Sequence, residues 1–67
     1  MKDHIHNLVQ QLSEKQDSVW RYENHYVKDA EQAGCDTCVA MYKKHLERDR
    51  EDVEELTTEL KKHLNEG

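Results

Sequence analysis

Apolar residues recur at alternating steps of three and four on both sides of Gly34, the only glycine before the terminal residue. The first series is Ile5, Leu8, Leu12, Lys15, Val19, Tyr22, Tyr26, Asp29 and Ala33, and the second is Val39, Tyr42, Leu46, Asp49, Val53, Leu56, Leu60 and His63. Each series is apolar apart from two polar members, which are Lys15 and Asp29 in the first and Asp49 and His63 in the second. Such steps place residues on one face of an α-helix. Each half of the chain is therefore predicted to form a helix with one largely apolar face.

Folding the chain back at Gly34 places the two series opposite each other, with Leu8 facing Leu60. This order of layers predicts an all-α fold, an antiparallel two-helix hairpin. We expect one domain over residues 1–67, with a first helix over about 3–33, a tip at 34–37 and a second helix over about 37–65. Glycine suits the left-handed residue that ends a helix, and Asp36 or Thr37 could cap the second helix.

The small size of the chain favours self-association. Only 34% of its 67 residues are hydrophobic, and two helices that bury one stripe each gain little against the entropy lost on folding. The first helix carries a second apolar strip, which consists of Val9, Trp20, Val27 and Ala30. We predict that first helices pack together in a homodimer, which gives a four-helix bundle. The alternative is that Trp20 and Val27 only widen the contact within one chain.

The charge pattern disfavours nucleic acid and membranes as partners. Ten Lys and Arg are interleaved with fifteen Asp and Glu, for a net charge of −5. No basic patch with interleaved aromatics is present, and no apolar run approaches the ~20 residues of a membrane span. With no signal-peptide pattern at the start, we expect a cytoplasmic location, where Cys35 and Cys38 would be reduced.

Cys35 and Cys38 form a C-x-x-C motif at the expected start of the second helix. Two thiols at this spacing could form a local disulfide or supply half of a zinc site, and a helix start favours the thiolate form. The βαβ context of a thioredoxin-like motif is absent. Inert or merely oxidisable thiols are the default interpretation, with a reversible redox switch and a metal site as alternatives.

A second candidate metal site lies midway along the hairpin. His25 and His45 fall on flanks that face each other in an antiparallel pair, and Asp49 follows His45 by four residues. Together they could offer three ligands to zinc or another divalent transition metal. The simpler interpretation places both histidines at the rim, where they bond to water, tyrosine or aspartate.

Four charged residues are predicted to form structural ion pairs. Lys15 and Asp49 interrupt the two apolar series about one helical turn apart, so they could pair diagonally. Glu23 and Lys43 occupy facing flank positions. Polar pairs of this kind fix the alignment of helices at some cost in stability.

No enzyme signature is present in the sequence. It lacks a glycine-rich phosphate loop, a nucleophile elbow and a Cys–His pair with a third orienting group. We therefore expect a non-enzymatic interaction or regulatory module without a cofactor. It would self-associate and could also bind a protein partner through its charged second helix or its tip. The alternative is a metal-binding or thiol-redox-responsive helical bundle.

Overall fold

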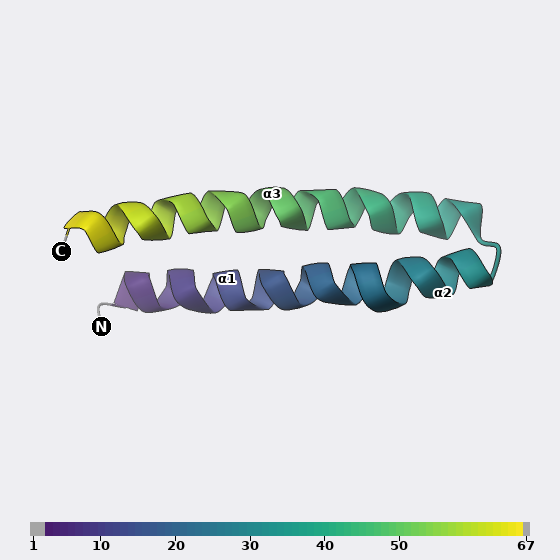
Figure 1. Ribbon diagram of the computed structural model, residues 1–67, viewed down its shortest axis with the longest axis horizontal. Coiled ribbons are helices and arrows are strands. Elements are labelled where there is room, and N and C mark those ends of the chain that lie inside the picture. Colours follow the sequence, from purple (N-terminus) through teal and green to yellow (C-terminus); the bar gives the residue numbers. More distant parts are fainter. Residues whose placement is uncertain (1–2, 67) are drawn as a thin grey trace.

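Residues 3–66 are described by a computed structural model and are almost entirely helical. The first arm consists of α1 (Asp3–Arg21), a π-helical turn η1 (Tyr22–Tyr26) and α2 (Val27–Gln32), and the second arm is α3 (Asp36–Glu66). Figure 1 shows α3 running back beside the first arm, with both ends of the chain at the same end of the molecule. The molecule measures 50 × 15 × 13 Å. No strand occurs within residues 3–66, and the predicted all-α class is confirmed.

The chain reverses direction at Gly34, which has a φ of +70°. The Gly34 N–H donates to the Glu31 carbonyl oxygen at 3.1 Å, and the Cys35 N–H donates to the Ala30 carbonyl oxygen at 3.0 Å. These two bonds form a Schellman motif, in which a left-handed residue satisfies the last carbonyls of a helix. The helix break is thus built from backbone bonds around the one residue type that adopts this φ without strain.

The cap of α3 differs from the prediction. Because α3 begins at Asp36, the residue at its cap position is Cys35. The Cys35 sulfur accepts a hydrogen bond from the Cys38 N–H at 3.3 Å. A cap accepts from this third N–H of a helix, so the predicted role of Asp36 or Thr37 belongs to Cys35.

The interior between the arms is thin. Within residues 3–65 only Val27, Ala30 and Leu46 are buried, with 8%, 7% and 7% of their surface exposed. The other aliphatic residues that α1 and α3 contribute to the two predicted series, here called the seam, are half-buried; they are Ile5, Leu8, Leu12, Val19, Val39, Val53, Leu56 and Leu60. Two arms cover only one side of each other, so their apolar stripes stay open at both edges.

The π turn changes which face of the first arm meets α3. In η1 the Val27 N–H bonds to the Tyr22 carbonyl oxygen, five residues back. A π turn holds one residue more than an α turn, so every later residue shifts by one position around the helix. Val27 and Ala30 therefore face α3, whereas Tyr26 and Asp29 of the predicted series lie exposed. This corrects the prediction for Val27 and Ala30, which were expected at a dimer interface and instead form the core.

Candidate functional site

The three predicted metal ligands at mid-length are not brought together. The His25 ring packs edge-on against Trp20 with centroids 5.1 Å apart, because a π turn brings residue i+5 over residue i. His45 Nδ1 lies 3.4 Å from the Tyr22 hydroxyl, and Asp49 is engaged by other side chains. Among the side chains described, those of residues 3–65, no three from His, Cys, Asp or Glu are grouped so as to hold a metal ion. The structure therefore does not bring His25, His45 and Asp49 together as a set of ligands.

Asp49 is held by the first arm. Lys15 Nζ lies 3.4 Å from Asp49 Oδ1 and 3.1 Å from Asp52 Oδ2, and the Ser18 hydroxyl donates to Asp49 Oδ2. The bonds that Lys15 makes with the two carboxylates, chiefly that to Asp52, raise the pKa of Lys15. The predicted pairing of Lys15 with Asp49 is confirmed.

Glu23 pairs with a different residue from the one predicted. Its carboxylate lies 2.7 Å from an Arg50 guanidinium nitrogen rather than against Lys43. Arg50 sits two turns further along α3 on the same flank, and its planar fork suits a carboxylate better than an ammonium group does. The pair still links the two arms, so the flank is as predicted and the partner is corrected.

The tip of the molecule carries the sulfur atoms and an aromatic cluster. The rings of Tyr22 and Tyr26 lie 6.0 and 5.9 Å from that of Tyr42. A surface groove of about 290 Å³ adjoins this cluster; it is lined by Tyr26, Asp29, Ala30, Ala33, Cys35, Cys38 and Tyr42. The cysteines were candidates from the sequence alone, whereas the rotation at η1 brings Tyr26 to the groove.

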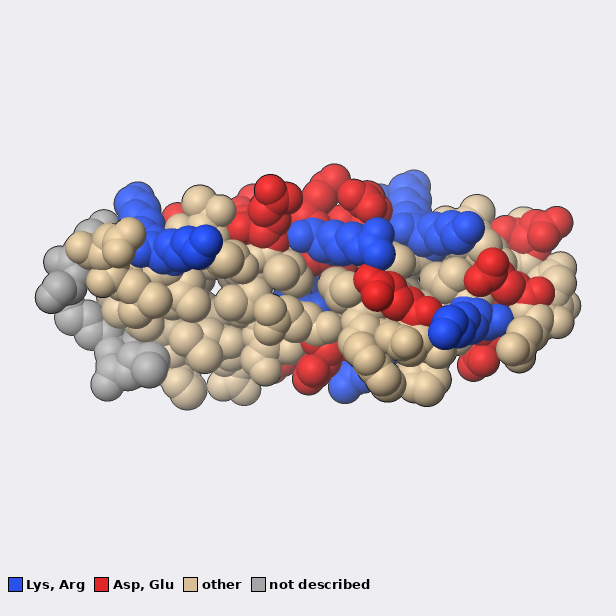
Figure 2. All heavy atoms as spheres, in the orientation of Figure 1, with Lys and Arg blue, Asp and Glu red and all other residues tan. Residues whose placement is uncertain are grey.

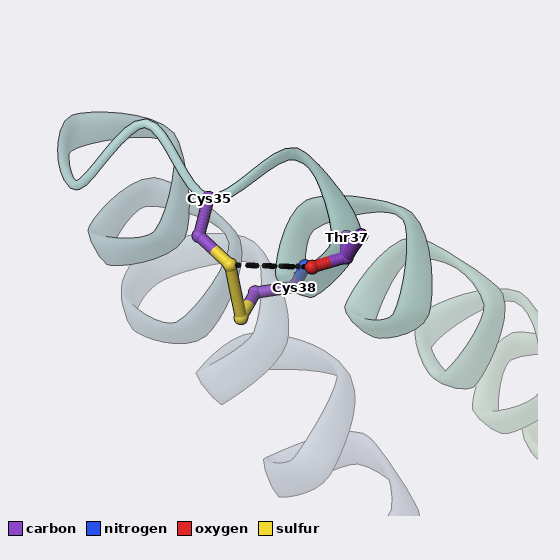
Figure 3. The surroundings of a disulfide bond; sticks show 3 residues. All are labelled: Cys35, Thr37 and Cys38. Atoms are coloured by element: carbon purple, nitrogen blue, oxygen red, sulfur yellow. Dashed lines mark hydrogen bonds between the residues drawn. A yellow bond between two sulfur atoms is a disulfide. The ribbon is translucent and has the colours of Figure 1, made fainter.

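Cys35 and Cys38 are joined by a disulfide (Figure 3) and are not the reduced thiols that were predicted. Their Cα atoms are 5.3 Å apart, within the span of a disulfide. The Cys35 sulfur also lies 3.6 Å from the Thr37 hydroxyl. Both cysteines are half-exposed, so solvent reaches the bond.

An uncharged stripe runs along the outer side of α1. Its members repeat at steps of three and four and are His6, Val9, Ser13, Gln16 and Trp20. Val9 and Trp20 are 41% and 56% exposed. Charged side chains crowd along α3, and the first half of α1 presents a broad uncharged surface (Figure 2). We call these five residues the α1 stripe.

Leu64 of α3 lies on the same side of the molecule as the α1 stripe. Gln16 and Arg50 line one shallow groove of about 160 Å³ between the arms. Val9 lies two turns before Gln16 and Leu64 four turns after Arg50, so helical spacing puts both on that side. Leu64 is 64% exposed, which adds a third large apolar residue, one outside the predicted interface.

No described helix has both the length and the apolar character needed to cross a membrane. Comparison of the chain with protein-family models, with curated proteins and with solved structures gave no match.

Proposed function

We propose that this chain is a non-catalytic helical interaction module that self-associates through the α1 stripe, pairing two hairpins into a four-helix bundle. The supporting observation is the imbalance between a thin core and the apolar side chains left outside it. Val9, Trp20 and Leu64 are more exposed than any of the seam residues that face α3 from α1. Burying them would add the stabilisation that two arms alone supply poorly.

The composition of the α1 stripe favours a second copy of the chain as its occupant. The five residues of the α1 stripe include no Asp, Glu, Lys or Arg, so two stripes can meet along their length without removing a full charge from water. A two-fold interface uses the same patch on both copies and must therefore be complementary to itself.

Antiparallel pairing of two α1 stripes produces complementary contacts. With the symmetry axis midway between Ser13 and Gln16, Val9 of one copy lies opposite Trp20 of the other. Ser13 then lies opposite Gln16, a pair that can exchange hydrogen bonds. His6 lies opposite Glu23, which closes the interface with a polar contact at each end. Aromatic anchors with polar neighbours are typical of stable protein interfaces.

The charged surface of α3 remains free in this arrangement and supplies the face for a protein partner. Glu51, Glu54, Glu55 and Glu59 lie together on α3 around a shallow surface depression with Thr58. Lysines and arginines flank them along the same helix (Figure 2). A dimer would display two such faces on opposite sides, an arrangement suited to bridging two partners.

The test is the mass of the protein in solution. Sedimentation equilibrium of the full chain should give twice the chain mass, and Trp20→Ala should shift the equilibrium to the monomer because it removes the largest anchor. Met41→Ala is the matched control, since Met41 is 45% exposed but lies on α3 outside the proposed interface. Circular dichroism of each variant verifies that the helices remain.

Two results would overturn the proposal. If the wild-type chain sediments as a monomer at high concentration, the α1 stripe does not mediate self-association. Equal loss of mass in Trp20→Ala and Met41→Ala would place the interface elsewhere. Dissociation by Trp20→Ala alone, with helix content unchanged, supports it.

A further inference from the structure

The two sulfur atoms at the tip differ in their surroundings. Cys35 lies directly before α3, and its sulfur accepts the Cys38 N–H at 3.3 Å and contacts the Thr37 hydroxyl at 3.6 Å. Cys38 belongs to the first turn of the helix itself. Figure 3 shows the Cys35 sulfur facing both the Thr37 hydroxyl and the first turn of α3. The donors that approach Cys35 are those that stabilise a negative charge at a helix start.

Once the disulfide is reduced, the surroundings of Cys35 favour the thiolate form of its side chain. A thiolate at Cys35 keeps the backbone N–H and gains from the positive end of a 31-residue helix. Thiolates rather than thiols attack disulfides, so the cysteine with the better-stabilised charge reacts first. Cys38, three residues on, is placed to complete the reaction, as the existing disulfide demonstrates.

We propose that the tip is a thiol–disulfide exchange site, with Cys35 as the attacking residue and Cys38 as the resolving residue. The Cys35 thiolate attacks a substrate disulfide, which forms a mixed disulfide and releases one substrate thiolate. The Cys38 thiolate then attacks the Cys35 sulfur, which forms the Cys35–Cys38 disulfide and releases the second substrate thiolate. Two electrons pass from the dithiol to the substrate, and the two protons lost by the cysteines end on the released thiolates. A substrate dithiol reverses the same steps.

The surroundings of the disulfide provide a place for the substrate. The groove beside it is open to solvent and carries the Tyr26 and Tyr42 rings together with the Asp29 carboxylate. Tyr26 is 42% exposed, which leaves ring surface for the carbon chain next to a substrate sulfur. The carboxylate favours a substrate with a positively charged or neutral group near the disulfide. A cysteine-containing peptide or a small aminothiol disulfide has this chemistry.

The site lies apart from the α1 stripe. The stripe ends at Trp20, whereas the cysteines follow the turn at Gly34, at the far end of the molecule (Figure 1). Exchange activity therefore does not depend on self-association, and each can be tested without the other.

The experiment uses the reduced full-length chain with oxidised glutathione as the probe, followed by mass spectrometry of quenched samples. Wild type should pass through a brief mixed disulfide to the Cys35–Cys38 disulfide with no bound glutathione. Cys38→Ser should stop at the mixed disulfide on Cys35. At pH 7 this adduct should form at least about threefold faster than the adduct of Cys35→Ser, in which only Cys38 can react.

Two controls separate the proposal from the general reactivity of thiols. The same Cys38→Ser variant unfolded in urea should lose its rate advantage, because the helix start no longer exists. Thr37→Ala in the Cys38→Ser background should slow adduct formation, because it removes the hydroxyl that contacts the Cys35 sulfur. Circular dichroism without urea should show that the single and the double variant are folded.

The proposal fails if Cys35→Ser reacts as fast as Cys38→Ser in the folded chain. It also fails if wild type stays at the mixed disulfide, since Cys38 would then not resolve it. An oxidised fraction of the wild type that follows the ratio of reduced to oxidised glutathione supports exchange. A bond that no ratio of the two glutathione forms opens identifies a purely structural disulfide.

Discussion

Lys15 and Asp49 meet across the two arms, with Nζ 3.4 Å from Oδ1, at positions where both helices otherwise present apolar side chains. The Asp49 side chain is only 14% exposed, and its carboxylate also accepts a hydrogen bond from the Ser18 hydroxyl. A polar pair inside an apolar seam fixes alignment, because sliding α3 by one turn would set a carboxylate against hydrocarbon.

The ion pair predicts a specific dependence on alkaline pH. The pKa of Lys15 is raised in the folded chain, chiefly by its hydrogen bond to Asp52. The contribution of the charged lysine to the free energy of unfolding is therefore complete below lysine's ordinary pKa of about 10.4, and it is lost as the pH rises through the folded pKa. Lys15→Met should lower the free energy of unfolding by about 0.5–1 kcal/mol at pH 7, since the pair is partly screened by water. The difference from wild type should shrink above about pH 10.5.

Melting temperatures of both chains between neutral and strongly alkaline pH measure this difference. Lys44→Met, on the exposed outer side of α3, controls for the general effect of removing a lysine. A gap between wild type and Lys15→Met that stays constant at alkaline pH contradicts the assignment.

The π turn predicts an unusual tolerance to deletion. Removing Asn24 should convert η1 to an α-turn while Val27 and Ala30 keep facing α3, at a cost below about 1 kcal/mol for the lost side-chain bond to the Trp20 carbonyl. Removing Gln10 from the regular part of α1 should rotate the residues before it off the seam and cost more than about 2 kcal/mol. Thermal melts followed by circular dichroism compare the two; similar losses would mean that η1 does not set the register.

The left-handed backbone at Gly34 predicts a cost for any side chain there. No atom lies within 4 Å of a Cβ built at this position, so the cost of Gly34→Ala comes from the φ of +70° and should be about 1 kcal/mol. Gly34→Asn should cost less, because asparagine adopts this conformation more readily. Urea unfolding measures both. If alanine proves as stable as glycine, the turn does not need a left-handed residue.

The thin core predicts that single truncations are severe. Leu46 is 7% exposed, and Leu46→Ala should cost about 2–4 kcal/mol, a large share of the stability of a chain this small. Glu51→Ala on the exposed side of α3 should change stability by less than about 0.5 kcal/mol. Urea unfolding of both variants tests whether the seam of α3 is correctly placed, and comparable losses would show that it is not.

Several features of this protein follow from local rules and were predictable. The alternation of three and four residues determines helices, because no other regular structure places those positions on one face. Gly34 determines where the first arm ends, since it is the one internal residue that takes a positive φ without strain. The pairing of Lys15 with Asp49 follows from the same spacing once the two helices lie side by side.

The side chains near the tip were decided by tertiary structure alone. A π turn is unfavourable locally, and no residue pattern from Tyr22 to Tyr26 predicts one. It forms because shifting the register by one residue buries Val27 and Ala30 against α3 and leaves Tyr26 and Asp29 in water. Whether the π turn forms thus depends on how the whole first arm packs against α3 with and without the shift. The same shift placed His25 beside Trp20 and opened the Tyr26 ring to the groove at the disulfide, which no periodicity within one helix encodes.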